Sequence, residues 1–533
     1  MSLPPEVYLI GCGNRSVDPG QTSPESIGFK AWNLLRMAQL SLPVPAAFVI
    51  GTCYGADPHT RAAGAGLWQA SLAALERASG LALGNPRRPL LVSVRSGAPV
   101  SMPGMMDTLL NIGLCDATVG GLVRQTGNPR LAWDAYRRLV ASYGEVVAGL
   151  PAGPFEEAAM ALSAGRDPGD LDFAELRALT QRCLDVYAQG AGRPFPQDPA
   201  QQLGEAIEAV FASWQSPKAI EYRRLNRIAD TIGTAVTVQR MVFGNAGGQS
   251  GAGVGFTRDP SSGEPSLWVD FLFDAQGEDV VSGRRSAHGH EELAAVLPEV
   301  WHELLEAAGQ LEHALGDMQE FEFTVQCGRL FMLQTRSGKR TPLAAARIAL
   351  DLLDEGLIST RVAQQRTASL VRESLAQPRV VAAGGAVLAP MGRAFSASSG
   401  VAVGEVALDE AHAATRHATG AAVVLVRRDA ETDDIAALES AAGLLTQRGA
   451  RTSHAAVVAR QLGKVCLVGC SKLQIDEVAR TVRVGDTVVN EGGLITLDGN
   501  EGVFYAGAAQ VEVTYPEALL ERLETLRRRD PSG

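Results

Sequence analysis

The 533-residue chain has little of three features that mark large protein classes: positive net charge, long apolar runs and paired cysteines. Its formal net charge is −11, whereas general polyanion binders are basic, so we expect neither nucleic acid nor an anionic membrane as a partner. No stretch approaches about 18 uninterrupted apolar residues, so no membrane-spanning helix is expected. The opening MSLPPEVYLIGCGN has neither the basic segment nor the apolar core of a signal peptide.

Cysteine usage points to a reducing compartment. The seven cysteines are scattered and odd in number, which is typical of free thiols in a cytoplasmic protein and not of a disulfide framework. Cys466 and Cys470 lie in an apolar run without a second Cys or His pair at zinc-site spacing. We therefore expect both thiols in a hydrophobic core.

The texture of the chain predicts several α/β units, because about 150 residues per domain suggests three or four. Short apolar strands such as 47–52 and 89–97 alternate with loops in residues 1–115, and amphipathic helices fill 116–228. Strands return in 229–340 and end in a hairpin that turns at Cys327-Gly328. Helices and a polar link occupy 341–385, a compact α/β unit occupies 386–514, and a charged tail occupies 515–533.

Glycines gather between two predicted strands, in MVFGNAGGQSGAGVGFTRDPSSGE at 241–264. Glycine permits positive φ and close approach of the backbone, so consecutive amides can turn inward and bind phosphate oxygens. The alternative is a hairpin whose glycines only serve bends. The glycines alone leave both interpretations open.

Charged and amide side chains at other strand ends favour the phosphate interpretation. Arg95 ends a strand before a second Gly/Ser-rich turn, and Gln334 and Arg336 share one face of a strand. Glu320 and Glu322 have the same spacing on the partner strand and could bind a hard cation. Each charge alone would be interpreted as a solvated surface residue. Together they suit a nucleoside triphosphate with magnesium.

These segments resemble the ATP-grasp domain of pyruvate phosphate dikinase: Arg95 with SMPGMMDT, the MVFGN and FTRDPSSGE segments, DAQGEDVV at 274–281, and LQTRSGKRT. The resemblance runs from about residue 28 to 514. It implies an ATP-grasp fold with lobes at 1–115 and 229–340, a helical insert at 116–228 and a helical linker at 341–385. It also implies Mg²⁺ near Glu322 and Gln334, and a set of ATP-binding residues: Lys30, Arg95, Gly248, Gln249, Ser250, Gly251, Gly253, Glu278, Gln334 and Arg336.

Three departures from the family pattern bear on turnover. Phe29 precedes Lys30 where the family has glycine and would hinder close approach of the lysine loop. Ala252 replaces a threonine whose hydroxyl could bond phosphate, a bond typically worth about 1.5–3 kcal/mol. Asp270 and Glu320 each stand where the other acid is expected. We expect ATP binding, with turnover rate and nucleotide choice left open.

One histidine has the setting of a nucleophile. In AGLLTQRGARTSHAAVVARQLG, Thr452 and Ser453 occupy N-cap positions, and the helix from His454 stops at Gly463. Free amides and the positive dipole end at a helix start favour an anion and disfavour protonation of an imidazole. A phosphoryl group gained by His454 would be met by those amides and by Arg448 or Arg451. The alternative is a plain surface histidine, which is how we interpret the other seven: 59, 288, 290, 302, 313, 412 and 417.

The same stretch resembles the swivelling phosphohistidine domain of phosphoenolpyruvate-utilising enzymes, whose motif is GGMTSHAAVVAR. The resemblance implies that His454 is the phosphorylated residue and that Thr452 matches a regulatory phosphorylation site. Ala450 and Arg451 replace the motif's Gly and Met, and the added arginine should favour the phosphorylated form.

The expected activity is the half-reaction in which ATP, inorganic phosphate and His454 give AMP, diphosphate and phosphohistidine. The pyruvate-binding barrel of the family needs about 250 residues, and about twenty follow residue 514, so we expect the acceptor on a separate polypeptide. A homodimer is implied by the resemblance. Two alternatives stay open: a dikinase with a small-molecule or glucan acceptor, and a degenerate ATP-binding paralogue that regulates a full dikinase.

Overall fold

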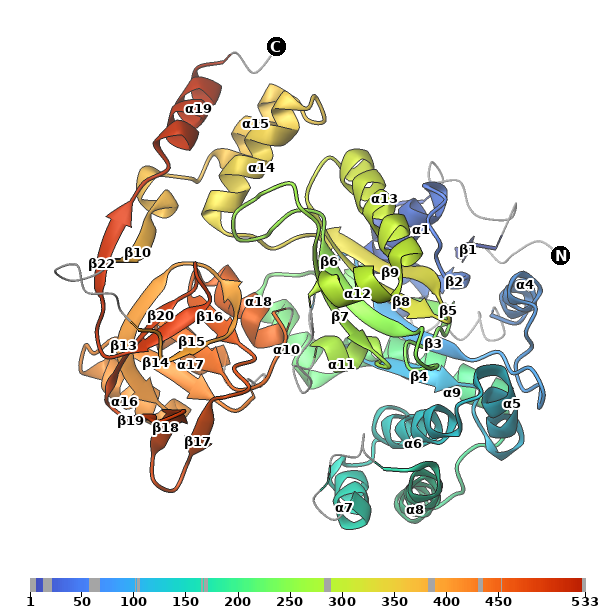
Figure 1. Ribbon diagram of the computed structural model, residues 1–533. Helices are drawn as coiled ribbons and strands as arrows, with labels where there is room; N and C mark the ends of the chain where they lie inside the picture. Colours follow the sequence, from blue (N-terminus) through green and yellow to red (C-terminus); the bar gives the residue numbers. More distant parts are fainter. Residues whose placement is uncertain are drawn as a thin grey trace. The chain divides into compact units, whose positions relative to one another are not determined.

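The computed structural model describes residues 6–12, 22–56, 68–100, 102, 106–163, 166, 171–281, 289–381, 389–429, 435–451 and 453–529. The chain divides into two compact units: residues 1–250 with 331–335, and residues 251–330 with 336–533. In the described segments no helix is both long and apolar enough to cross a membrane. Figure 1 labels the elements along the chain.

Unit 1 is built on a five-stranded antiparallel sheet of order β1-β2-β5-β3-β4. Its strands are β1 (Val7–Ile10), β2 (Ala47–Ile50), β3 (Val92–Gly97), β4 (Thr108–Ile112) and β5 (Ala235–Arg240). The central strand β5 follows the helical segment in sequence, although the expected lobe boundary at 228 assigned it to the later lobe. The first lobe therefore takes in the chain through Ser250.

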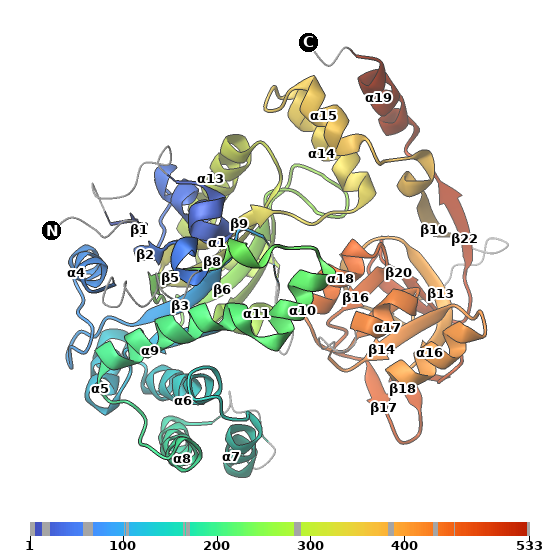
Figure 2. The ribbon, with the colours of Figure 1, turned by 180° about the vertical axis from the view of Figure 1, so that it is seen from behind.

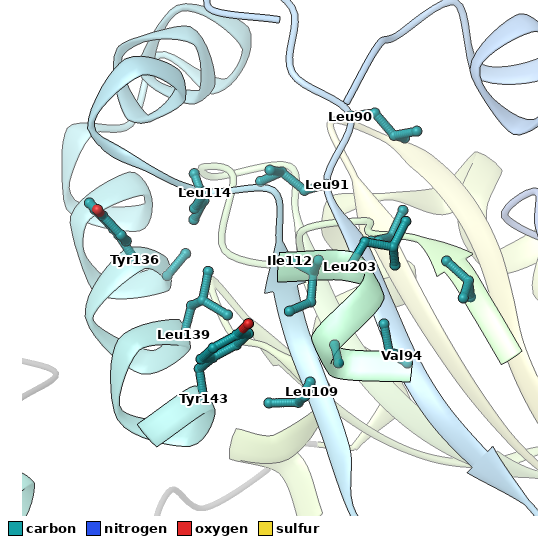
Figure 3. Packing of buried hydrophobic residues seen from close by; sticks show 14 of the residues in the cluster. Leu90, Leu91, Val94, Leu109, Ile112, Leu114, Tyr136, Leu139, Tyr143 and Leu203 are labelled. Carbon is teal, nitrogen blue, oxygen red and sulfur yellow. The ribbon is translucent and has the colours of Figure 1, made fainter. Parts of the chain in front are cut away.

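Alternation along the central strands separates a hydrophobic face from a polar one. Val92 and Val94 of β3, like Val236 and Val238 of β5, point into the main core of unit 1. Side chains alternate along a strand, so Ser93, Arg95, Thr237 and Gln239 occupy the other face. Figure 3 shows the core side, where Leu139 and Tyr143 approach Leu109 and Ile112 of β4.

Helices cover both faces of this sheet. Helix α9 lies against β3 and β4 on the core side, next to α6 (Figure 2). Side-chain N-caps start four of these helices: Asn128 for α6, Asp172 for α8, Asp198 for α9 and Ser216 for α10. The helical elements are α1 (Pro24–Gln39), α2 (Thr52–Ala56), α4 (Trp68–Ser79), α5 (Asp116–Thr126), α6 (Pro129–Val146), α7 (Gly153–Ser163), α8 (Phe173–Ala191), α9 (Pro199–Ala212), η4 (Ser213–Gln215), α10 (Pro217–Leu225) and η5 (Asp230–Ile232).

Unit 2 begins with a sheet of order β7-β6-β8-β9. Its strands are β6 (Gly251–Phe256), β7 (Trp268–Phe273), β8 (Gln319–Gln326) and β9 (Arg329–Ser337), with helices α11 (Gly277–Val281), α12 (His290–Val296) and α13 (Pro298–Leu315). The expected hairpin is confirmed, and its turn places Cys327 and Gly328 at φ of 50° and 72°. Residues 331–335 of β9 group with unit 1, where Met332 N–H donates to the Pro43 carbonyl at 2.8 Å.

Three glycines of the expected phosphate loop lie inside strand β6. Gly251, Gly253 and Gly255 pair with strands on both sides. A Cβ on Gly251 would lie 2.1 Å from the ring of Phe271, and one on Gly253 would lie 2.5 Å from that of Phe323. The glycines therefore make room for aromatic rings on one face of the sheet, which is a packing reason and not a turn.

A second, mixed sheet forms the centre of the region from residue 391 to 506. Its order is β11-β21-β20-β13-β14-β15-β16-β12, and β13, β14, β15 and β16 run parallel, joined through α16, α17 and α18. The sheet strands are β11 (Gly392–Arg393), β12 (Phe395–Ser398), β13 (Val401–Ala407), β14 (Val423–Arg427), β15 (Gly443–Thr446), β16 (Val465–Val468), β20 (Leu494–Asp498) and β21 (Val503–Ala506).

Helices α16 (Glu410–Ala418), α17 (Ile435–Ser440) and α18 (His454–Gln461) pack on one face of this sheet. On the other face lies a three-stranded sheet of β17 (Gln474–Asp476), β18 (Thr481–Val484) and β19 (Thr487–Asn490). Cys466 and Cys470 are buried as expected, and burial raises the pKa of the Cys466 thiol to about 12.

The linker continues into elements that pair with the end of the chain. It comprises α14 (Pro342–Asp354), α15 (Thr360–Thr367), η6 (Arg372–Leu375) and β10 (Gln377–Val381). Strand β10 pairs with β22 (Gln510–Thr514), and α19 (Glu517–Arg528) buries Leu519, Leu523 and Leu526 against the linker helices. The segment expected as a charged tail from 515 is therefore largely a packed helix.

Candidate nucleotide and phosphohistidine site

Helix α1 is interrupted at Gly28, two residues before Lys30. Gly28 has φ 75° and ψ 154°, and a Cβ there would lie 2.0 Å from the carbonyl oxygen of Gly97 in β3. The next amide, of Phe29, donates to the Ala98 carbonyl at 3.2 Å. The break thus places helix α1 against the end of β3 and fixes the backbone position of Lys30.

A pocket of unit 1 collects three of the expected ATP-binding residues. It is lined by Lys30 and Leu34 of α1, Arg95 of β3, Thr237 and Gln239 of β5, and Leu333 and Gln334 of β9. Asn33 Nδ2 donates to the Thr335 carbonyl at 2.9 Å, which ties α1 to β9. The pocket therefore presents two cationic side chains and two amides on the polar face of the sheet.

Thr237 and Gln239 were missed by the sequence interpretation. They belong to TAVTVQR, where polar residues alternate with valine, and this pattern is the signal that could have found them. Thr237 lies beside Arg95 in the register of β3 and β5. Among the residues that the structure describes, its buried hydroxyl has no hydrogen-bond partner, as expected for a group that faces a ligand or water.

The remaining part of the glycine-rich segment is a turn in unit 1. Gly247 has φ 122°, and its carbonyl accepts from Ser250 N–H at 2.8 Å. Gly248 and Gln249 are exposed and Ser250 is buried. The contact of this turn with phosphate stays a prediction, as it does for Gly251 and Gly253 in the strand.

Two of the family departures have local explanations. Phe29 is 47% exposed, while Lys30 lines the pocket, so the ring does not fill the lysine's place. Ala252 is buried in an apolar cluster with Val254, Leu272 and Ala344. A hydroxyl at 252 would enter that cluster, so the loss of a phosphate bond expected from this substitution does not follow from the structure.

The acids of unit 2 form a row on one face of its first sheet. Asp270 of β7 and Glu322 of β8 both lie opposite Val254 of β6, one on each side. Glu320 lies two residues along and forms an ion pair with Arg336. Burial works against the charge of Arg336, but the Glu320 hydrogen bond and the charges of Glu320 and Glu322 outweigh it and raise its pKa.

His454 begins helix α18 at the carboxyl end of strand β15. The Ser453 side chain caps the helix by accepting from Ala456 N–H, and Gly463 follows the helix with φ 65°. The expected helix start and stop are confirmed. Thr452 and the side chains of His454 and Glu278 lie outside the described part of the structure.

Arg451 and Arg448, both expected near the phosphoryl group, have different partners. Arg451 pairs with Asp270 of β7 at 2.6 Å and stacks over Trp268, with Cζ 4.0 Å from the ring centroid. Arg448 reaches Asp429 at 4.0 Å. The sequence could not have shown the Arg451–Asp270 pair, because its members are 181 positions apart.

Comparison with known proteins agrees with this arrangement. Residues 69–290 match the family described as pyruvate phosphate dikinase, AMP/ATP-binding domain, and residues 420–502 match PEP-utilising enzyme, mobile domain. Pyruvate, phosphate dikinase 2 of Zea mays is 43% identical over 491 residues, which cover 91% of this chain and 56% of the relative. Pyruvate, phosphate dikinase 1, chloroplastic, of Arabidopsis thaliana is 41% identical over 527 residues, 97% of this chain and 54% of the relative. This chain, which spans little more than half the length of these relatives, belongs to the pyruvate phosphate dikinase family.

Proposed function

We propose that the chain carries out the ATP half-reaction of a dikinase and keeps one phosphoryl group on His454. The observation that carries the proposal is the position of His454 as the first residue of α18, at a capped helix N-terminus. Free amides there can bind the oxygens of a phosphoryl group on the ring. The neighbouring ring nitrogen is then a nucleophile beside its own anion site.

The proposed chemistry balances as two displacements. An imidazole nitrogen attacks the β-phosphorus of ATP. The bond from the oxygen that bridges the α- and β-phosphorus atoms to the β-phosphorus breaks, and AMP leaves with that oxygen. Inorganic phosphate then attacks the γ-phosphorus, and diphosphate leaves with the phosphate's oxygen as the new bridge. The β-phosphoryl group stays on His454. Both steps are helped by cations that neutralise charge on the phosphates.

Pocket residues of unit 1 supply the polyphosphate contacts in this proposal. Lys30 and Arg95 provide positive charge, and Gln334 and Thr237 provide neutral hydrogen-bonding groups. Arginine suits this role because its planar fork can donate two parallel hydrogen bonds to one phosphate. The turn at 247–250 adds backbone amides.

Magnesium fits the acids of unit 2 if the substrate shares its coordination. The described residues contain no group of three or more His, Cys, Asp or Glu side chains placed to hold a metal ion. Mg²⁺ usually binds through one or two carboxylates together with substrate phosphates. The carboxylate of Glu322 in β8 would hold it in this proposal, and the ion would neutralise phosphate charge.

The final acceptor is bound outside these 533 residues in our proposal. Pyruvate is the acceptor that the names of the relatives suggest. The swivelling of a phosphorylated mobile domain toward that acceptor would complete the reaction.

A single-turnover experiment tests the half-reaction. The chain is mixed with ATP, Mg²⁺ and inorganic phosphate, and nucleotides and diphosphate are quantified over time. We expect a burst of about one AMP per chain, with diphosphate formed only when phosphate is present. Formation of ADP instead of AMP would reject a dikinase, and release of orthophosphate without diphosphate would show that water takes the γ-phosphoryl group.

Replacing Arg95 with methionine is expected to weaken ATP binding by about 10- to 100-fold. One charge-assisted hydrogen bond contributes about 1.5–3 kcal/mol, and Arg95 is one of the two cations in the pocket. The dissociation constant is measured by calorimetry with the non-hydrolysable β,γ-imido analogue of ATP.

Arg124→Met is the matched control for that variant. Arg124 is exposed on helix α5 of the same unit and donates to the Pro86 carbonyl at 3.5 Å. It should bind the analogue as the parent chain does. Equal affinity of the Arg95 and Arg124 variants would remove Arg95 from the site.

A further inference from the structure

Arg451 makes four polar or stacking contacts on strand β7, outside the mobile domain that carries it. Its Nε donates to Asp270 Oδ1 at 2.8 Å, and a terminal nitrogen lies 2.6 Å from the same oxygen. A terminal nitrogen also donates to the Val269 carbonyl at 3.0 Å, and the guanidinium stacks on Trp268. Three consecutive residues of one strand therefore hold one side chain.

Because this contact is buried, the side chain at position 451 must be both positively charged and planar. The Asp270 side chain is 1% exposed and that of Arg451 is 19% exposed. A buried carboxylate loses hydration that only a well-placed cation restores, and removal of the partner leaves an uncompensated charge. Stacking on Trp268 needs a planar cation, so lysine would not replace arginine.

Neighbouring residues fix the backbone on both sides of Arg451. Ala450 is buried with Ala252 and Val254 of β6 and with residues of α14. From α18, Arg460 donates to the Arg451 carbonyl at 3.3 Å and to the Ala397 carbonyl at 2.7 Å. Arg460 is 2% exposed, and its burial lowers its pKa. The loop before His454 is thus seated on the first sheet of unit 2.

We propose that Arg451 is a charge-sensitive positioning residue: it anchors the loop of His454 on strand β7 through Asp270 and Trp268, and a phosphoryl group on His454 releases that anchor. The release rests on the proposed function, whereas the anchor stands on the contacts alone. Arg451 lies three positions before His454, and in this proposal the phosphoryl group competes with Asp270 for its guanidinium.

Charge decides the direction of that competition. A phosphoryl group carries about −1.5 to −2 charges at neutral pH and three acceptor oxygens, against one negative charge on Asp270. Its binding by Arg451 would break the ion pair of Arg451 with Asp270, and undocking would return that carboxylate to water. Phosphorylation therefore favours departure of the loop from the sheet. The unphosphorylated loop returns because Asp270 regains Arg451.

Hydrogen exchange without any nucleotide tests the anchor. Peptides covering β7 and residues 443–462 are followed in the parent chain and in Arg451→Met, Asp270→Asn and the double variant. We expect exchange about tenfold faster in both segments for each single variant, and little further change in the double variant. Arg451→Lys should keep only part of the protection from exchange that the parent chain shows.

Arg416→Met is the matched control. Arg416 of α16 forms a two-point ion pair with Glu405 of the adjacent strand β13, with bonds of 2.6 and 2.8 Å. It should leave exchange in β7 unchanged, and unchanged peptides elsewhere in the Arg451 variant would confirm that it folds. Equal exchange in β7 for the Arg451 and Arg416 variants would overturn the anchor.

Chemical phosphorylation separates the release from the ATP reaction. Phosphoramidate, a small phosphoryl donor to imidazoles, is used to phosphorylate His454, and mass spectrometry confirms the site. We expect the phosphorylated parent chain to exchange as fast as Arg451→Met does. Phosphorylation of the Arg451→Met variant should not raise its exchange rate further. Unchanged or slower exchange after phosphorylation of His454 would overturn the proposed release of Arg451 from Asp270. This outcome can be read even if the chain never reacts with ATP.

Discussion

Replacing Gly28 with alanine is expected to destabilise unit 1 by about 2–4 kcal/mol and to remove Lys30 from the nucleotide pocket. The added Cβ would lie 2.0 Å from the Gly97 carbonyl oxygen, at a φ of 75°. A side chain at positive φ is strained, and overlap with backbone cannot be relieved by a rotamer change. The helix must move away from β3. Urea unfolding and affinity for the β,γ-imido analogue of ATP report the two effects.

Gly120→Ala is the control for this substitution. Gly120 lies in helix α5 of the same unit, and beyond the helix backbone and the adjacent residues no described atom lies within 4 Å of a Cβ built there. Alanine favours a helix over glycine by up to about 1 kcal/mol, so this variant should be as stable as the parent or more so. A Gly28 variant with unchanged stability and affinity would show that the break in α1 is not needed.

The elements that depend on a few neighbouring residues could be predicted from the sequence. The hairpin at 327–328 needs positive φ at two adjacent positions, and Cys-Gly between two apolar runs is enough to place it. Ser453 before HAAVV predicts the start of α18 because the cap is made within three residues. The grouping of Lys30, Arg95 and Gln334 in one pocket came from the family resemblance, since no local rule links them.

Other features depend on distant partners and were hidden from the sequence. In the sequence, the glycines of β6 resemble a phosphate loop. Only the structure shows that the rings of Phe271 and Phe323 pack against them. Strand β5 joins the sheet between β2 and β3, across nearly 140 residues of chain after β3. The end of the chain looked like a tail because its three buried leucines need the linker helices to be recognised.

Replacing His454 with alanine is expected to reduce covalent labelling of the chain by ATP to background, a loss of at least about a hundredfold. No other residue can hold the β-phosphoryl group if the imidazole is the nucleophile. His417→Ala is the matched control, because His417 lies in the last turn of helix α16 in the same domain. A carbonyl-rich helix end repels an anion, so the control should label fully.

The central claim is tested most directly by incubating the chain with Mg²⁺, inorganic phosphate and ATP labelled at the β-phosphate. We predict a protein-bound label that is lost in acid, survives in base, and maps to the peptide containing His454. The label should be absent from His454→Ala and present in His417→Ala. A label of the same stability that persists in His454→Ala would contradict the assignment of His454 as the phosphoryl carrier.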